Sequence, residues 1–143
     1  MTLQEFSAAR RREAKRMLAA MRQAARSGDS AVWFQSHGEF HRVITAGAGN
    51  PLQRQLIAFA ERSTRYIRIC QLADPASWHT AGDTEHAVIL EPLTEGDREA
   101  PLSGLARHLA GTAERVLTDC APGYEMNAVP RALELVAGSA AST

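Results

Sequence analysis

Two histidines stand four residues apart in the stretch from Ala31 to Ala46, AVWFQSHGEFHRVITA. Residues four apart lie one turn above each other on an α-helix, so His37 and His41 can both reach one metal ion. At about 100° per residue, the same helix face carries four apolar side chains, Trp33, Phe34, Phe40 and Ile44. We therefore expect the two imidazoles to lie within an apolar stripe and not on the solvent side.

Two further histidines fall beside apolar positions of later predicted helices. His86 shares a face with Ile89, Leu90 and Leu93, and His108 lies at the edge of a stripe that contains Leu105. A single histidine in such a place is more often a core residue with one backbone partner than a metal ligand. Four unpaired buried imidazoles, however, would each cost on the order of 1–3 kcal/mol, and one divalent ion would remove most of that cost.

The residues therefore predict one divalent transition metal held by His37, His41, His86 and His108. An imidazole-rich set suits Zn²⁺, Ni²⁺, Cu²⁺ or Fe²⁺ better than Mg²⁺ or Ca²⁺. The fifth histidine, His79, falls in a predicted loop and is expected at the surface. The zinc-protease motif is rejected, because it needs Glu directly after the first histidine and Gly38 stands there.

The hydrophobic pattern follows a helical period along the chain and shows no useful two-residue alternation. We predict an all-α fold, an antiparallel bundle of about six helices. The expected helices are 2–27, opened by a Thr2–Glu5 capping box and closed by Gly28, then 31–46, 51–72, 83–95, 97–119 and 129–136. Asp29 or Ser30 is expected to cap the second helix, residues 74–82 are expected to form a loop, and Pro92 is expected to kink or shorten the fourth helix.

Composition limits the class of protein. The chain has 143 residues, 45% of them hydrophobic, with a formal net charge of zero. It is therefore expected to bury a real core and has no overall field that would attract nucleic acid or an anionic membrane. No apolar run is long enough for a signal peptide or a membrane span, and Cys70 and Cys120 lack CxxC spacing, so a cytoplasmic protein with reduced thiols is expected.

Several short pieces of the chain together resemble the FCD domain, the all-helical C-terminal effector-binding domain of GntR-type transcription regulators. The pieces are Phe40-His41, Ala48-Gly49-Asn50-Pro51, residues 85–90, Gly96-Asp97 and Arg107-His108-Leu109, and the resemblance covers about residues 15 to 118. It implies a divalent metal held in the bundle interior by one Asp and three His, next to a small carboxylate effector. By position the three family histidines are His41, His86 and His108, and the family Asp is replaced by His37.

The same resemblance implies two missing parts. There is no room for the winged helix-turn-helix that reads DNA, and the first helix of the family domain is expected to be lacking. We therefore expect residues 1–120 to form a metal-binding bundle and 121–143 to form an extension with a short helix and a frayed tail. A homodimer that cannot bind DNA by itself is expected, because an uncovered helix stripe favours pairing.

Two functions remain open at this stage. The first is a stand-alone binding domain that senses a small anion at the metal, a carboxylate by the family resemblance, with Ser63 and Tyr66 of the third helix as inward-facing ligand contacts. The second is a stand-alone metalloenzyme that uses the metal as a Lewis acid or to activate water or oxygen. Fold resemblance does not decide between them.

Overall fold

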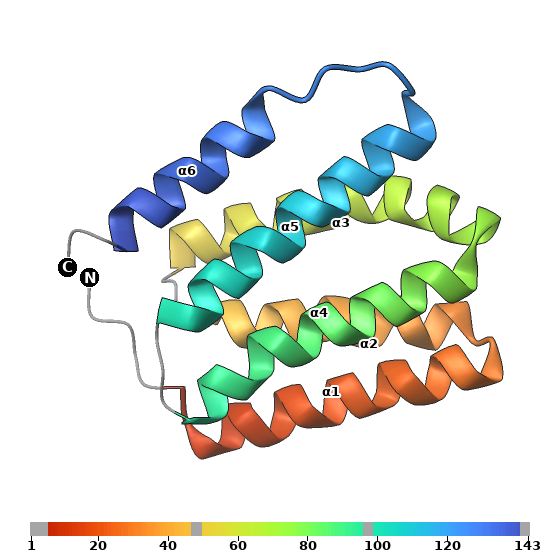
Figure 1. Ribbon diagram of the computed structural model, residues 1–143. Helices are drawn as coiled ribbons and strands as arrows, with labels where there is room; N and C mark the ends of the chain where they lie inside the picture. The colour runs from red at the N-terminus through yellow and green to blue at the C-terminus, as the bar shows by residue number, and fades with distance from the viewer. Residues whose placement is uncertain (1–5, 47–49, 96–98, 141–143) are drawn as a thin grey trace.

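The computed structural model describes residues 6–46, 50–95 and 99–140, and within these residues it contains six α-helices and no strand (Figure 1). The helices are α1 (Ala8–Ser27), α2 (Ser30–Thr45), α3 (Asn50–Ala73), α4 (Pro75–Glu95), α5 (Glu99–Cys120) and α6 (Ala128–Ala140). The predicted all-α bundle is confirmed. The predicted Thr2–Glu5 capping box and Gly96-Asp97 turn lie outside the described residues.

The turn between α1 and α2 is specified by three local signals. The α1 helix begins at Ala8, later than predicted, because Ser7 is the N-cap and its side chain accepts a hydrogen bond from the Arg10 N–H at 3.3 Å. Gly28 ends the helix with a φ of 71°, the left-handed conformation that glycine adopts without strain. Asp29 then caps α2 by accepting from the Val32 N–H at 3.0 Å, as predicted.

The main core joins α1, α2 and α4, which lie side by side at the bottom of Figure 1. It consists of Ala14, Leu18, Met21, Ala24, Trp33, Phe40, Val43 and Leu90. A second, smaller cluster contains Ile67 and Cys70 of α3 and Trp78 of α4, with Val116 of α5 packed against it. Phe34 of α2 packs against both clusters and so connects them.

The helix α4 begins at Pro75, eight residues earlier than the predicted start at residue 83, because the predicted loop at 74–82 is wrong. Asp74 is a helix N-cap whose carboxylate accepts from the Ser77 N–H at 3.2 Å, and Pro75 occupies the first helical position, where its missing N–H costs nothing. Trp78 and His79 therefore stand on a helix. Pro92 does not shorten α4, which continues to Glu95.

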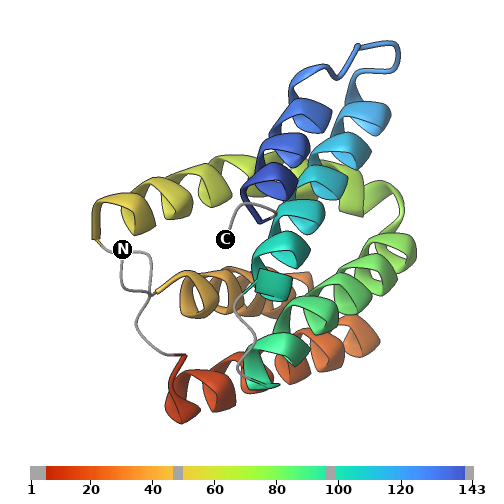
Figure 2. The ribbon, with the colours of Figure 1, turned by 60° about the vertical axis from the view of Figure 1, so that its left-hand side comes forward.

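The helices α3 and α6 cover the other side of the bundle (Figures 1 and 2). The α6 helix packs along α5 and is longer than the predicted 129–136 segment, since it reaches Ala140. The division of the chain at residue 120 stays a prediction. Within the described residues, no helix combines the length and the apolar character that crossing a membrane requires.

The Phe40 side chain offers a direct test of the main core, since it is fully buried and its ring contacts His41 and His86 edge-on. We expect Phe40→Ala to lower the free energy of unfolding by about 3–5 kcal/mol, the usual cost of removing a buried phenyl ring. Tyr124→Ala is the matched control, because the Tyr124 ring is 64% exposed and its removal should cost well under about 1 kcal/mol. Urea unfolding of both variants measures the difference, and equal losses would contradict this core.

Candidate metal centre

Four histidines from three helices meet in the interior of the bundle. His37 and His41 come from α2, His86 from α4 and His108 from α5, and one ring nitrogen of each lies within 4.8 Å of the others. All four side chains that the sequence singled out are thus brought together. As a set of nitrogen donors at this separation, they can hold a metal ion.

Two short contacts between ring nitrogens share one atom, His41 Nε2. His41 Nε2 lies 3.2 Å from His37 Nε2 and 3.3 Å from His86 Nε2. A neutral imidazole nitrogen is either one donor or one acceptor, so ordinary hydrogen bonds satisfy only one of these two contacts well. Two nitrogens bound at about 2.1 Å to a tetrahedral ion lie roughly 3.4 Å apart, so a shared cation fits both contacts.

The other ring nitrogens of two ligands are held by groups around the cluster. His108 Nδ1 lies 2.6 Å from Glu85 Oε2, and Glu85 Oε1 lies 3.4 Å from the Arg115 guanidinium. His86 hydrogen-bonds the backbone carbonyl of Gly82, one turn earlier on α4. Such contacts fix the tautomer and the orientation of a ligating imidazole and leave Nε2 free for the ion.

Burial keeps the rings uncharged. The pKa of His37 is lowered to about 3, chiefly by burial and further by the nearby His108 ring. Burial and the neighbouring imidazoles also lower the pKa of His41 and of His86 well below 6.5. The rings of His37, His41 and His86 are therefore neutral at pH 7, and the neutral ring is the form that binds a metal.

Aromatic side chains enclose the cluster on two sides. The Trp33 ring stacks on the His37 ring with centroids 4.9 Å apart and an interplanar angle of 13°. The Phe40 ring meets His86 edge-on at 4.9 Å. These contacts exclude water from the cluster and restrict its open directions.

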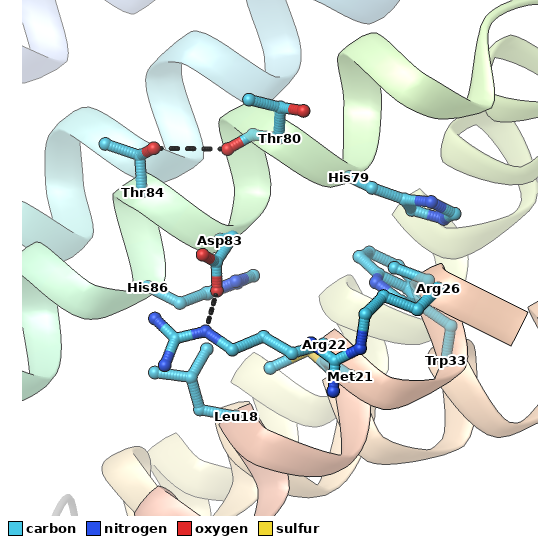
Figure 3. Close-up of a pocket in the computed structure, with 11 residues that line it drawn as sticks. Leu18, Met21, Arg22, Arg26, Trp33, His79, Thr80, Asp83, Thr84 and His86 are labelled. Carbon is cyan, nitrogen blue, oxygen red and sulfur yellow. Dashed lines mark hydrogen bonds and ion pairs between the residues drawn. The ribbon is translucent and has the colours of Figure 1, made fainter.

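A cavity of about 310 Å³ lies between α1 and α4, with Trp33 and His86 in its wall. Figure 3 shows Arg22 of α1 reaching across to Asp83 of α4, a contact of 2.5 Å, while Arg26 extends beside it. Both arginine side chains line the cavity.

His79 also lines this cavity, although it was expected in a surface loop. Its ring lies 5.2 Å from the Trp33 ring, its Nε2 atom is buried without a hydrogen-bond partner, and burial lowers its pKa. His79 and His86 are seven residues apart, about two helical turns, so they lie on the same face if one helix contains both. The prediction of a loop at 74–82 concealed this signal.

The expected ligand contacts on α3 do not face the interior. Tyr66 is 56% exposed and Ser63 is also exposed, and neither lines the cavity. The predicted inward orientation is wrong, because α3 turns Ile67, Cys70 and Gln71 towards the other helices instead. The ligand-binding role of Ser63 and Tyr66 stays a prediction.

Comparison with known proteins places this fold in a family. The sequence model of the FCD domain family matches residues 2–111. This span contains α1 to α4, the first half of α5 and all four clustered histidines. No curated protein and no solved structure matches the chain. FCD domains are the ligand-binding domains of GntR-type regulators. Because the match covers most of its length, the chain belongs to the FCD domain family.

Proposed function

We propose that this FCD domain binds one divalent transition-metal ion through His37, His41, His86 and His108 and uses it to hold a small carboxylate. The observation that carries the proposal is the double contact of His41 Nε2, which a shared cation accounts for and a pair of hydrogen bonds does not. Zn²⁺ and Ni²⁺ are the first candidates, and Fe²⁺ and Cu²⁺ suit the same donors.

Each residue has a separate part in this proposal. One ring nitrogen of each histidine, either Nε2 or Nδ1, would hold the ion. The bound ion would supply positive charge and a coordination position for a ligand oxygen. Glu85 would orient His108, and the Gly82 carbonyl would orient His86. The neutral rings leave the charge of the ion uncompensated, which favours an anionic ligand.

The cavity beside His86 supports a small anion as the ligand. Two guanidinium groups, those of Arg22 and Arg26, line it, against one carboxylate, that of Asp83. Arginine binds carboxylates through paired N–H donors, and a ligand carboxylate could compete with Asp83 for Arg22. The apolar side of the cavity, formed by Leu18 and Met21, suits a short hydrocarbon portion of the ligand.

We further propose that the domain pairs with a second copy and does not contact DNA through the bundle itself. Several large apolar side chains on α3 are exposed, namely Leu52, Phe59, Tyr66, Ile69 and Leu72. A second copy that covers them would remove a large apolar surface from water.

The alternative of a metalloenzyme has less support. A hydrolytic site needs a general base beside the metal. The carboxylate beside the cluster, Glu85, is engaged by His108 and Arg115, and Glu39 on α2 pairs with Arg42 at 2.9 Å. We therefore favour binding over turnover.

Metal content tests the centre. The purified chain, dialysed against Zn²⁺ or Ni²⁺, should hold one ion, and His41→Ala should weaken its affinity at least 100-fold because His41 makes both short contacts. His79→Ala is the matched control, since His79 lies outside the cluster, and it should keep the ion. Elemental analysis and competition with a chelator measure both. Equal retention by the two variants would refute the centre.

Acid should destabilise the metal-free protein. Unfolded histidine has a pKa near 6.5, whereas that of folded His37 is about 3, so below pH 6.5 the unfolded chain binds more protons. Stability is then lost as the pH falls from 6.5 towards 3, and His37 alone contributes a loss on the order of 2 kcal/mol by pH 5. Urea unfolding at pH 7 and pH 5 measures it. His37→Gln should reduce the pH dependence, and an unchanged dependence would contradict the assignment.

Carboxylate binding should require the ion. Acetate and succinate should raise the melting temperature of the metal-loaded protein but not that of the metal-free protein or of His41→Ala, because the ligand oxygen needs the ion. Arg22→Gln should reduce the shift while keeping the metal. Thermal unfolding and isothermal titration calorimetry provide the readouts. Equal shifts of the melting temperature with and without metal would mean that the anion binds independently of the ion, and would overturn this part of the proposal.

A further inference from the structure

The chain's two cysteines, although 50 residues apart in sequence, meet at the ends of two helices. Cys70 lies near the C-terminal end of α3 and Cys120 is the last residue of α5. Their Sγ atoms are 3.2 Å apart, and neither forms a disulfide. The sequence spacing had given no reason to expect this pair.

The two thiols have different surroundings. Cys70 is 3% exposed and packs in the second apolar cluster with Ile67 and Trp78, whereas Cys120 is exposed. Burial, and next the contact with Cys120, raise the pKa of Cys70 to about 11. Cys70 is therefore protonated at neutral pH, and Cys120 is the thiol that a dissolved oxidant reaches first.

We propose that Cys70 and Cys120 form a reversible disulfide when the protein meets hydrogen peroxide. The Cys120 thiolate attacks the peroxide, the O–O bond breaks, and Cys120 becomes a sulfenic acid while hydroxide leaves. The Cys70 sulfur then attacks the Cys120 sulfur, the S–O bond breaks, and the hydroxyl group leaves with the Cys70 proton as water. The two thiols lose two electrons in total, and the peroxide takes up both.

The geometry requires little movement. A disulfide brings the sulfur atoms to about 2.05 Å, so they must approach by roughly 1 Å more, within reach of a side-chain rotation at the exposed end of α5. The bond would tie α3 to α5 and close a ring of chain that contains all of α4. Because the cysteines are not part of the histidine cluster, this inference does not depend on the proposed metal.

The test uses the full chain and hydrogen peroxide. Treatment with a small molar excess should remove both thiols from reaction with a thiol reagent and leave a monomer lighter by two hydrogen atoms, and dithiothreitol should restore both. The oxidised protein should melt roughly 10 °C higher than the reduced protein, because the closed ring restricts the unfolded chain.

Cys120→Ser is the main variant, since this position is exposed and the substitution should leave the fold intact. It should abolish the peroxide-induced rise in melting temperature, and Cys70 should stay a free thiol. Cys70→Ala should instead stop the reaction at the sulfenic acid of Cys120, which a dimedone adduct reports. Overoxidation of Cys120, disulfide-linked dimers, or an unchanged melting temperature of the treated wild-type chain would overturn the proposal.

Discussion

Four imidazoles share one small volume in the interior, and the packing of three helices depends on how their polar nitrogens are satisfied. His41 is the critical residue, because its Nε2 atom faces two other ring nitrogens at 3.2 and 3.3 Å. In an apolar interior an unsatisfied nitrogen costs on the order of 1–3 kcal/mol, and burial opposes protonation of His37, His41 and His86. A shared cation would satisfy all of these groups at once and would link α2, α4 and α5 at one point.

The contacts around the cluster connect it to the rest of the fold. His108 is bound by Glu85, Glu85 by Arg115, and the Arg115 guanidinium lies 4.7 Å from the centre of the Trp78 ring. Trp78 in turn belongs to the second apolar cluster, which contains Cys70. A continuous series of contacts thus runs from the histidines to the place where α3 meets α5.

Local sequence signals predicted those features that depend on a single helix or turn. The four-residue spacing of His37 and His41 placed both on one face, and Gly28 with Asp29 marked the end of α1 and the start of α2. Features that depend on two segments far apart in the sequence had no such local signal. The contact between Cys70 and Cys120 is one of these features. The orientation of Tyr66 is another, because periodicity identifies the residues that share a face of α3 but not which face a neighbouring helix covers.

If His37 takes the place of the aspartate that the family resemblance implies, the replacement would change the charge balance of the proposed centre more than its geometry. The ring of His37 reaches the same cluster, but its pKa near 3 means that it contributes no charge at neutral pH. An ion held by four imidazoles would have no carboxylate among its ligands, and the negative charge beside it in the protein would be that of Glu85, which contacts His108. A charge in an apolar interior is costly unless it is paired. With an aspartate ligand, the protein itself supplies one negative charge at the ion. With His37 an anionic ligand would supply that charge, so binding of the metal and binding of the carboxylate should depend on each other more strongly than when the protein provides a carboxylate ligand.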